Sequence, residues 1–203
     1  MIICPQARVL YLNPPRTGSS LILRELRRRQ RRVIRPRDGC AGHQTEWEDR
    51  FAGFFVFQSV RHPFPRAVSI WRRLVENMQH RDAHWRAYLE DGEISFQGLL
   101  DHEHEEIQGY WRWMRCRHFA ERAGHVDKVV YLETLHRDLA GVPLLSDWRP
   151  TQVINPKQDE RPWQAYYTPQ ARRRVCELFA DDFQAYGYTQ DLSACCRGQY
   201  FAP

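Results

Sequence analysis

Lysine, Cys-x-x-Cys pairs and long apolar runs are scarce or absent in this sequence of 203 residues. A membrane-spanning helix needs about 18 consecutive apolar residues, and no such run occurs. The first residues also lack the basic region and the apolar run of a signal peptide. We therefore expect no membrane span and a cytoplasmic protein.

The six cysteines form no Cys-x-x-Cys pair, and Cys195 and Cys196 are adjacent. This spacing argues against a zinc site and provides no disulfide framework. We expect mostly reduced thiols in a reducing compartment.

Nearly all of the positive charge is arginine, because Lys128 and Lys157 are the only lysines and the net charge is +5. Arginine binds phosphate and sulfate bidentately, so the composition suits an anionic ligand. A genome rich in G and C would produce the same bias.

The stretch 24–37 also suggests a nucleic-acid-binding module. No RNA or DNA motif accompanies it, and most of its arginines extend an amphipathic helix, so we expect no nucleic-acid partner.

The pattern of apolar residues predicts the fold. Runs typical of strands stand at 8–12, 33–34, 54–60 and 129–132. Helical patterns follow residues 18 and 63 and cover 82–123, 133–140 and 168–186. Alternating strands and helices predict an α/β protein with a central parallel sheet flanked by helices, in a P-loop-like nucleotide-binding architecture and a single domain over 1–203. Ligands of such sheets bind beyond the carboxyl ends of the strands.

The first strand-to-helix turn carries groups that bind phosphate. Gly18 permits a close backbone approach or a positive φ, and the helix N-terminus presents unpaired N–H groups. Arg16 adds charge, and the hydroxyl groups belong to Thr17, Ser19 and Ser20. The loop lacks the Gly-Lys pair of nucleotide triphosphatases. A polar turn with a helix cap is the alternative interpretation.

A second turn of the same kind follows the run 54–60. It places Arg61 at the end of the strand and Ser69 two helical turns later. Two such turns with basic and hydroxyl groups are typical of a site that binds two anionic groups.

Four segments, in this order and spacing, resemble sulfotransferases that use 3′-phosphoadenosine 5′-phosphosulfate (PAPS). Residues 15–21 resemble their 5′-phosphosulfate loop, and residues 61–69 resemble their 3′-phosphate segment, R-x-P-x-x-R-x-x-S. Residues 131–135 are similar to their strand ending in Tyr-Glu-x-Leu. The carbohydrate-type branch has a tail similar to Asn155, 166–169 and 182–188. The resemblance thus implies three segments: donor-binding motifs at 8–75, a helical region on the acceptor side at 82–123, and the C-terminal family segment at 127–188.

The resemblance implies in-line transfer of a sulfuryl group from PAPS to a hydroxyl or amine of a carbohydrate or small hydroxyl compound, without a metal. The implied ligands of the 5′-phosphosulfate are Arg16, Thr17, Gly18, Ser19, Ser20 and Leu21. Those of the 3′-phosphate are Arg61 and Ser69. The family usually has lysine at the position of Arg16. Because arginine does not donate a proton at ordinary pH, Arg16 would act in catalysis only by stabilising charge.

A neutral acceptor hydroxyl needs a base, and His43 is the candidate. It stands in a Gly-His pair after the run 33–34, similar to the base region of some carbohydrate sulfotransferases. Glu46 and Glu48 are the alternatives, and a surface histidine is the simpler interpretation. Lys157 and Arg161 stand where the family often supplies a further donor-binding loop.

Aromatic residues are dense between 85 and 119, above all at 110–115. Aromatic faces beside arginines suit a sugar or an anionic acceptor, and a buried helix face is the alternative. Trp47, Phe64 and Trp71 are possible walls of an adenine site or simply core residues.

Two other functions stay open, a P-loop-type nucleotide kinase or nucleotidase and a donor-binding relative without catalysis. The sequence does not identify the acceptor.

Overall fold

The structure is a computed structural model, and it describes residues 1–34, 51–80, 94–149 and 161–193. Its contacts group the chain into two compact units. The first unit contains the β-sheet and the helices that cover it, and the second unit is helical.

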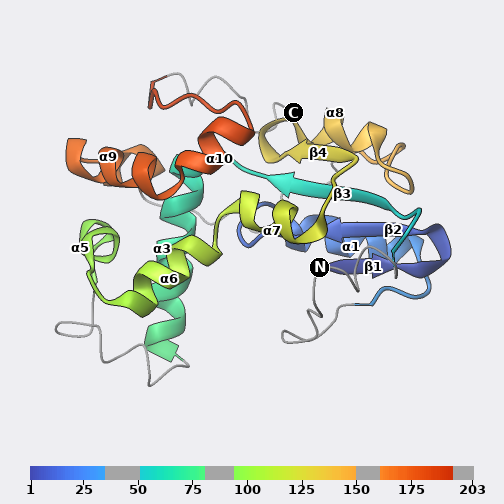
Figure 1. The fold of residues 1–203 in the computed structure, drawn as a ribbon, viewed down its shortest axis with the longest axis horizontal. Helices are drawn as coiled ribbons and strands as arrows, with labels where there is room; N and C mark the ends of the chain where they lie inside the picture. The colour runs from blue at the N-terminus through green and yellow to red at the C-terminus, as the bar shows by residue number, and fades with distance from the viewer. Residues whose placement is uncertain (35–50, 81–93, 150–160, 194–203) are drawn as a thin grey trace. The chain divides into compact units, whose positions relative to one another are not determined.

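The sheet of the first unit has four strands in the order β1-β2-β3-β4 (Figure 1). They are β1 (Ile2–Cys4), β2 (Val9–Leu12), β3 (Phe55–Val60) and β4 (Lys128–Tyr131). Strands β2, β3 and β4 are parallel, which confirms the expected α/β class. Strand β1 departs from the expectation because it pairs with β2 antiparallel. A 3-10 turn at Pro5–Ala7 reverses the chain there, and Arg8 closes it at φ 51°.

The short apolar run at 33–34 does not form the expected second strand. Ile34 makes only an isolated antiparallel bridge to Ile3, with both backbone hydrogen bonds at 2.9 Å. Two apolar residues after the exposed Arg31 and Arg32 are too few to extend a ladder. The run therefore borders β1 at the edge of the sheet.

Helices cover both faces of this sheet, as the alternation of side chains requires. Val9 and Tyr11 point to the face covered by α1 (Ser19–Arg29) and α8 (Leu135–Asp138). Leu10 and Leu12 point to the other face, where Ala123 of α7 (Cys116–Ala123) packs. The expected helix at 133–140 is in fact α8 between two 3-10 segments, Leu132–Thr134 and Leu139–Gly141.

The second unit is helical. Its elements are α3 (Pro63–His80), α5 (Phe96–Asp101), α6 (Glu105–Trp113), the 3-10 segment η4 (Trp163–Tyr166), α9 (Pro169–Leu178) and α10 (Ala180–Ala185). Thr168 caps α9 as expected, because its hydroxyl accepts from the Ala171 amide at 3.0 Å. The last helix is interrupted at Phe179, which is fully buried in this unit's core.

Candidate functional site

The loop between β2 and α1 has two residues in the left-handed region. Arg16 has φ 67° and Gly18 has φ 84°. Gly18 is the N-cap of α1, and its carbonyl accepts from the amides of Leu21 and Ile22 at 3.0 and 3.3 Å. The amides of Ser19 and Ser20 lie in the first turn, where a helix supplies no acceptor. With the helix dipole, they make this turn a place for an anion.

Glycine is required at position 18 for two reasons. A side chain rarely adopts its positive φ, and an added Cβ would lie 2.7 Å from Leu132 Cδ1. Leu132 directly follows β4, within the segment 131–135 that resembles the family. The first and third of the four resembling segments are therefore in contact in the first unit.

A chain of buried hydroxyl groups holds the loop against the sheet. The Thr17 hydroxyl donates to the Pro14 carbonyl at 2.7 Å and lies 2.6 Å from Ser59 Oγ. Ser59 Oγ lies 2.6 Å from the Tyr11 hydroxyl. Each hydroxyl has a single proton. Because Thr17 donates its proton to Pro14, Ser59 must donate to Thr17, and Tyr11 must donate to Ser59.

These hydrogen bonds show that the Thr17 side chain holds the loop in place. Thr17 is fully buried, and its hydroxyl points into the protein. Ser19 is half-buried, with its hydroxyl donating to the Pro14 carbonyl at 3.0 Å, and Ser20 is exposed. Burial raises the pKa of Tyr11 to about 12, so the phenol stays protonated and keeps its role as donor.

The basic residue of the second turn lies against this loop. Arg61 directly follows β3, and its Nη1 is 3.5 Å from the Arg16 carbonyl oxygen. Its Nε is buried and has no hydrogen-bond partner among the described residues. A buried donor of this kind favours an acceptor, and a charged one favours an anion. The arrangement therefore fits a phosphate or sulfate group.

Asn13 also belongs to this region, although the sequence did not single it out. It follows β2, and its Oδ1 is buried without a hydrogen-bond partner in the part of the chain that the structure describes. Tyr11 and Ser59 were missed as well. Hydroxyl-bearing residues inside two otherwise apolar strand runs were the available signal.

The other arginine of the second motif, Arg66, is fully buried in the second unit. Its Nη1 lies 3.1 Å from Asp182 Oδ2, and its Nη2 donates to the Met114 carbonyl. The ring of Phe179 lies 5.9 Å from the guanidinium. Arg66 thus joins the motif at 61–69 to the C-terminal segment at 182–188. Ser69 lies half-buried on α3 of the same unit.

Several candidates lie outside the described residues: His43, Glu46, Trp47, Glu48, Asn155 and Lys157. Arg161 is exposed. Phe64 is fully buried, and the half-buried Trp71 packs against the same core and donates to the Ile94 carbonyl at 2.9 Å. Within the dense aromatic stretch, Trp111 is fully buried and donates to the Leu99 carbonyl, whereas Trp113 is 44% exposed.

Cys4, Cys116 and Cys176 are free thiols. Burial raises the pKa of the Cys4 thiol to about 11.

No helix in the described ranges is long and apolar enough to cross a membrane. The same ranges contain no cluster of three His, Cys, Asp or Glu side chains that could hold a metal ion.

The structure is thus an α/β protein with a mostly parallel sheet, in which Arg61 lies beside the loop before α1 at the strand ends. The model of the sulfotransferase family matches residues 1–189, a range that takes in residues of both units. The chain therefore belongs to the sulfotransferase family, whose members are transferases that move sulfuryl groups. No curated protein and no solved structure matches it.

Proposed function

We propose that this sulfotransferase takes its sulfuryl group from PAPS and transfers it to a hydroxyl or amine of a carbohydrate or small hydroxyl compound. One observation carries the proposal. The side chain of Arg61, from the second motif, lies 3.5 Å from the carbonyl of Arg16 in the first. A donor with anionic groups at both ends of its ribose needs a basic group beside the loop that binds its 5′ end.

In the proposed site, the 5′-phosphosulfate is bound by the loop from Arg16 to Leu21. The amides of Gly18, Ser19 and Ser20 are the proposed donors, and the dipole of α1 adds to their effect. Arg61 and Ser69 are the proposed ligands of the 3′-phosphate, by resemblance to the family. The buried Thr17 side chain supports the loop from below, so its proposed contribution is through the backbone.

The reaction needs positioning and stabilisation of charge more than covalent participation by the protein. The acceptor oxygen forms a bond to sulfur while the bond from sulfur to the 5′-phosphate oxygen breaks, and 3′,5′-ADP leaves. Arg16 stabilises the charge that develops on the bridging oxygen. Because arginine keeps its proton, the acceptor proton goes to another group. We propose His43 as this base, with Glu46 and Glu48 as alternatives.

Thermal unfolding with added nucleotides tests the donor site. A ligand that binds the folded state alone stabilises it by about 2.7 kcal/mol at 100 times its dissociation constant. We expect 3′,5′-ADP to raise the unfolding temperature well beyond ADP or ATP. The absence of any shift at millimolar 3′,5′-ADP would refute the proposal, and a shift that requires ATP and Mg²⁺ would favour a kinase.

A second measurement separates an active transferase from a relative that only binds the donor. His43→Ala should lower the turnover of PAPS with an acceptor by about 100-fold or more while the affinity for 3′,5′-ADP stays the same. Near-normal turnover would remove His43 from the mechanism. Glu46→Gln and Glu48→Gln, assayed in the same way, identify the alternative base.

A further inference from the structure

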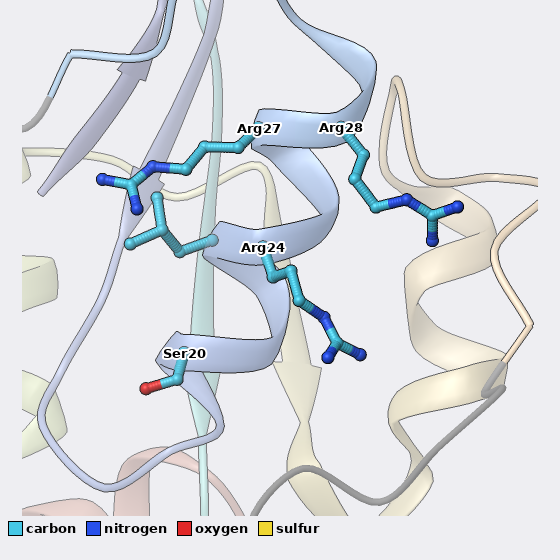
Figure 2. Close-up of a pocket in the computed structure, with 5 residues that line it drawn as sticks. Ser20, Arg24, Arg27 and Arg28 are labelled. Carbon is cyan, nitrogen blue, oxygen red and sulfur yellow. The ribbon is translucent and has the colours of Figure 1, made fainter.

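Two of the three hydroxyl groups in the loop before α1 form hydrogen bonds within the loop itself. The Pro14 carbonyl oxygen accepts from the Thr17 hydroxyl at 2.7 Å and from the Ser19 hydroxyl at 3.0 Å. Ser20 is exposed instead, and Figure 2 shows it beside the arginines of α1 in a surface pocket of about 440 Å³. Because a hydroxyl group has a single proton, Thr17 and Ser19 have none left for a bound anion. The backbone amides are therefore the main donors that the loop itself offers to an anion.

These amides depend on an uncommon conformation of the backbone. Arg16, which is not a glycine, has φ 67°, and Gly18 has φ 84°. A residue with a side chain stays in the left-handed region only where its surroundings enforce it. Contacts from outside the loop hold this backbone. Arg61 Nη1 lies 3.5 Å from the Arg16 carbonyl oxygen, and Ser59 Oγ lies 2.6 Å from Thr17 Oγ1.

Ser59 connects the loop to the interior of the sheet. It is fully buried on β3, where it donates to the Thr17 hydroxyl and accepts from the Tyr11 hydroxyl. It stands outside the segments 15–21 and 61–69 that resemble the family. Removal of its hydroxyl would free the loop from the sheet at Thr17 without changing any residue of the loop.

We propose, on the basis of the proposed donor site, that Ser59 is a positioning residue for the donor. Its hydroxyl holds the loop in the conformation that presents the amides of Gly18, Ser19 and Ser20 to the 5′-phosphosulfate. When only a fraction of the molecules has the ordered loop, the dissociation constant rises by the inverse of that fraction. The net effect of a typical buried hydrogen bond corresponds to about a fivefold change in an equilibrium constant.

The test compares the wild type with Ser59→Ala, Thr17→Val and the double variant. Thr17→Val keeps the shape of the side chain and breaks the same hydrogen bond from the side of the loop, so it also tests the bond if Ser59→Ala does not fold. Gln58→Met is the matched control. Gln58 precedes Ser59 on β3, is fully buried, and donates to the Cys116 carbonyl at 2.6 Å on the opposite face of the sheet.

Two measurements are made on all five proteins. Calorimetry gives the dissociation constants of 3′,5′-ADP and of 5′-AMP. Amide hydrogen exchange without any ligand reports on the first turn of α1, where Leu21 and Ile22 donate to the Gly18 carbonyl at 3.0 and 3.3 Å. We expect Ser59→Ala to bind both nucleotides about fivefold more weakly and to exchange these two amides about fivefold faster, whereas Gln58→Met stays within about twofold of the wild type.

The double variant should bind no more weakly than Thr17→Val, because both changes break the same hydrogen bond. Wild-type affinity in Ser59→Ala, an equal loss in Gln58→Met, or additive losses in the double variant would each overturn the role of Ser59. Weaker binding by Thr17→Val with unchanged exchange would mean that Thr17 contacts the donor directly, which also overturns it. A wild type that binds neither nucleotide would instead refute the donor site itself.

Discussion

The hydrogen-bonded hydroxyl groups beneath the loop predict that the effects of Tyr11 and Ser59 substitutions on the free energy of unfolding depend on each other. Tyr11→Phe removes the hydroxyl that donates to Ser59 Oγ at 2.6 Å. It keeps the ring, which stacks on the Phe57 ring at a centroid distance of 4.6 Å. A typical buried hydrogen bond contributes about 1 kcal/mol net. We therefore expect Tyr11→Phe to lower the free energy of unfolding by about 1 kcal/mol in the wild type.

Ser59→Ala has a larger effect, because it removes two hydrogen bonds and takes the acceptor at 2.6 Å away from the buried Tyr11 hydroxyl. An unsatisfied buried donor costs about 1–3 kcal/mol, so the total loss should be about 2–4 kcal/mol. The decisive result comes from combining the changes. In the Ser59→Ala background, Tyr11→Phe removes the unsatisfied hydroxyl and should be neutral or stabilising.

Urea unfolding of the four proteins in this double-mutant cycle measures the coupling. Tyr166→Phe is a suitable control, because Tyr166 is half-buried and its contacts with the Trp71 ring at 5.2 Å and the Arg72 guanidinium at 4.9 Å involve its ring. The control should change stability by less than about 0.5 kcal/mol. If Tyr11→Phe costs the same in both backgrounds, the proposed direction of hydrogen bonding through Ser59 is wrong.

Three further predictions concern stability. Gly18→Ala, which forces a side chain into φ 84°, should lower the free energy of unfolding by about 1–2 kcal/mol and should also weaken 3′,5′-ADP binding. Arg66→Met leaves the Asp182 carboxylate buried without its cation and should cost about 3–5 kcal/mol in urea unfolding, part of which Arg66→Met/Asp182→Leu should restore. Because the pKa of Tyr11 rises from 10.0 to about 12 on folding, the unfolded chain loses this proton first as the pH increases. Stability should therefore fall between these two pH values by up to about 1.4 kcal/mol per pH unit, and Tyr11→Phe should reduce that slope; an unchanged slope would contradict the burial of this hydroxyl.

Local patterns predicted the central elements of the fold. Strands β2, β3 and β4 coincide with β-type runs in the sequence, and the Gly-Ser-Ser turn marked the start of α1. Of the two roles that the sequence left open for Gly18, a close backbone approach or a positive φ, the structure shows the positive φ. Strand β1 was missed because three apolar residues next to a proline carry little periodic signal. Its antiparallel direction depends on the left-handed Arg8, which nothing in the sequence marks.

The sequence patterns could not predict contacts between residues that lie far apart in the chain. Thr17 was expected to face a ligand, but its hydroxyl is bonded to Ser59, 42 residues away. Arg66 stood in a recognised motif, yet its burial follows from Asp182, 116 residues away. Both residues stand in segments that resemble family motifs, and only the fold shows that their side chains point into the protein.

The central claim is that the loop and Arg61 together bind a donor with phosphates at both ends. Calorimetry of 3′,5′-ADP and of 5′-AMP, which lacks the 3′-phosphate, tests it most directly in the wild type and in Arg61→Gln. Since a hydrogen bond to a charged group contributes about 1.5–3 kcal/mol, the wild type should prefer 3′,5′-ADP by roughly 10-fold or more. Arg61→Gln should lose most of this preference and bind 5′-AMP as before. Equal affinity of the wild type for both nucleotides would contradict the account.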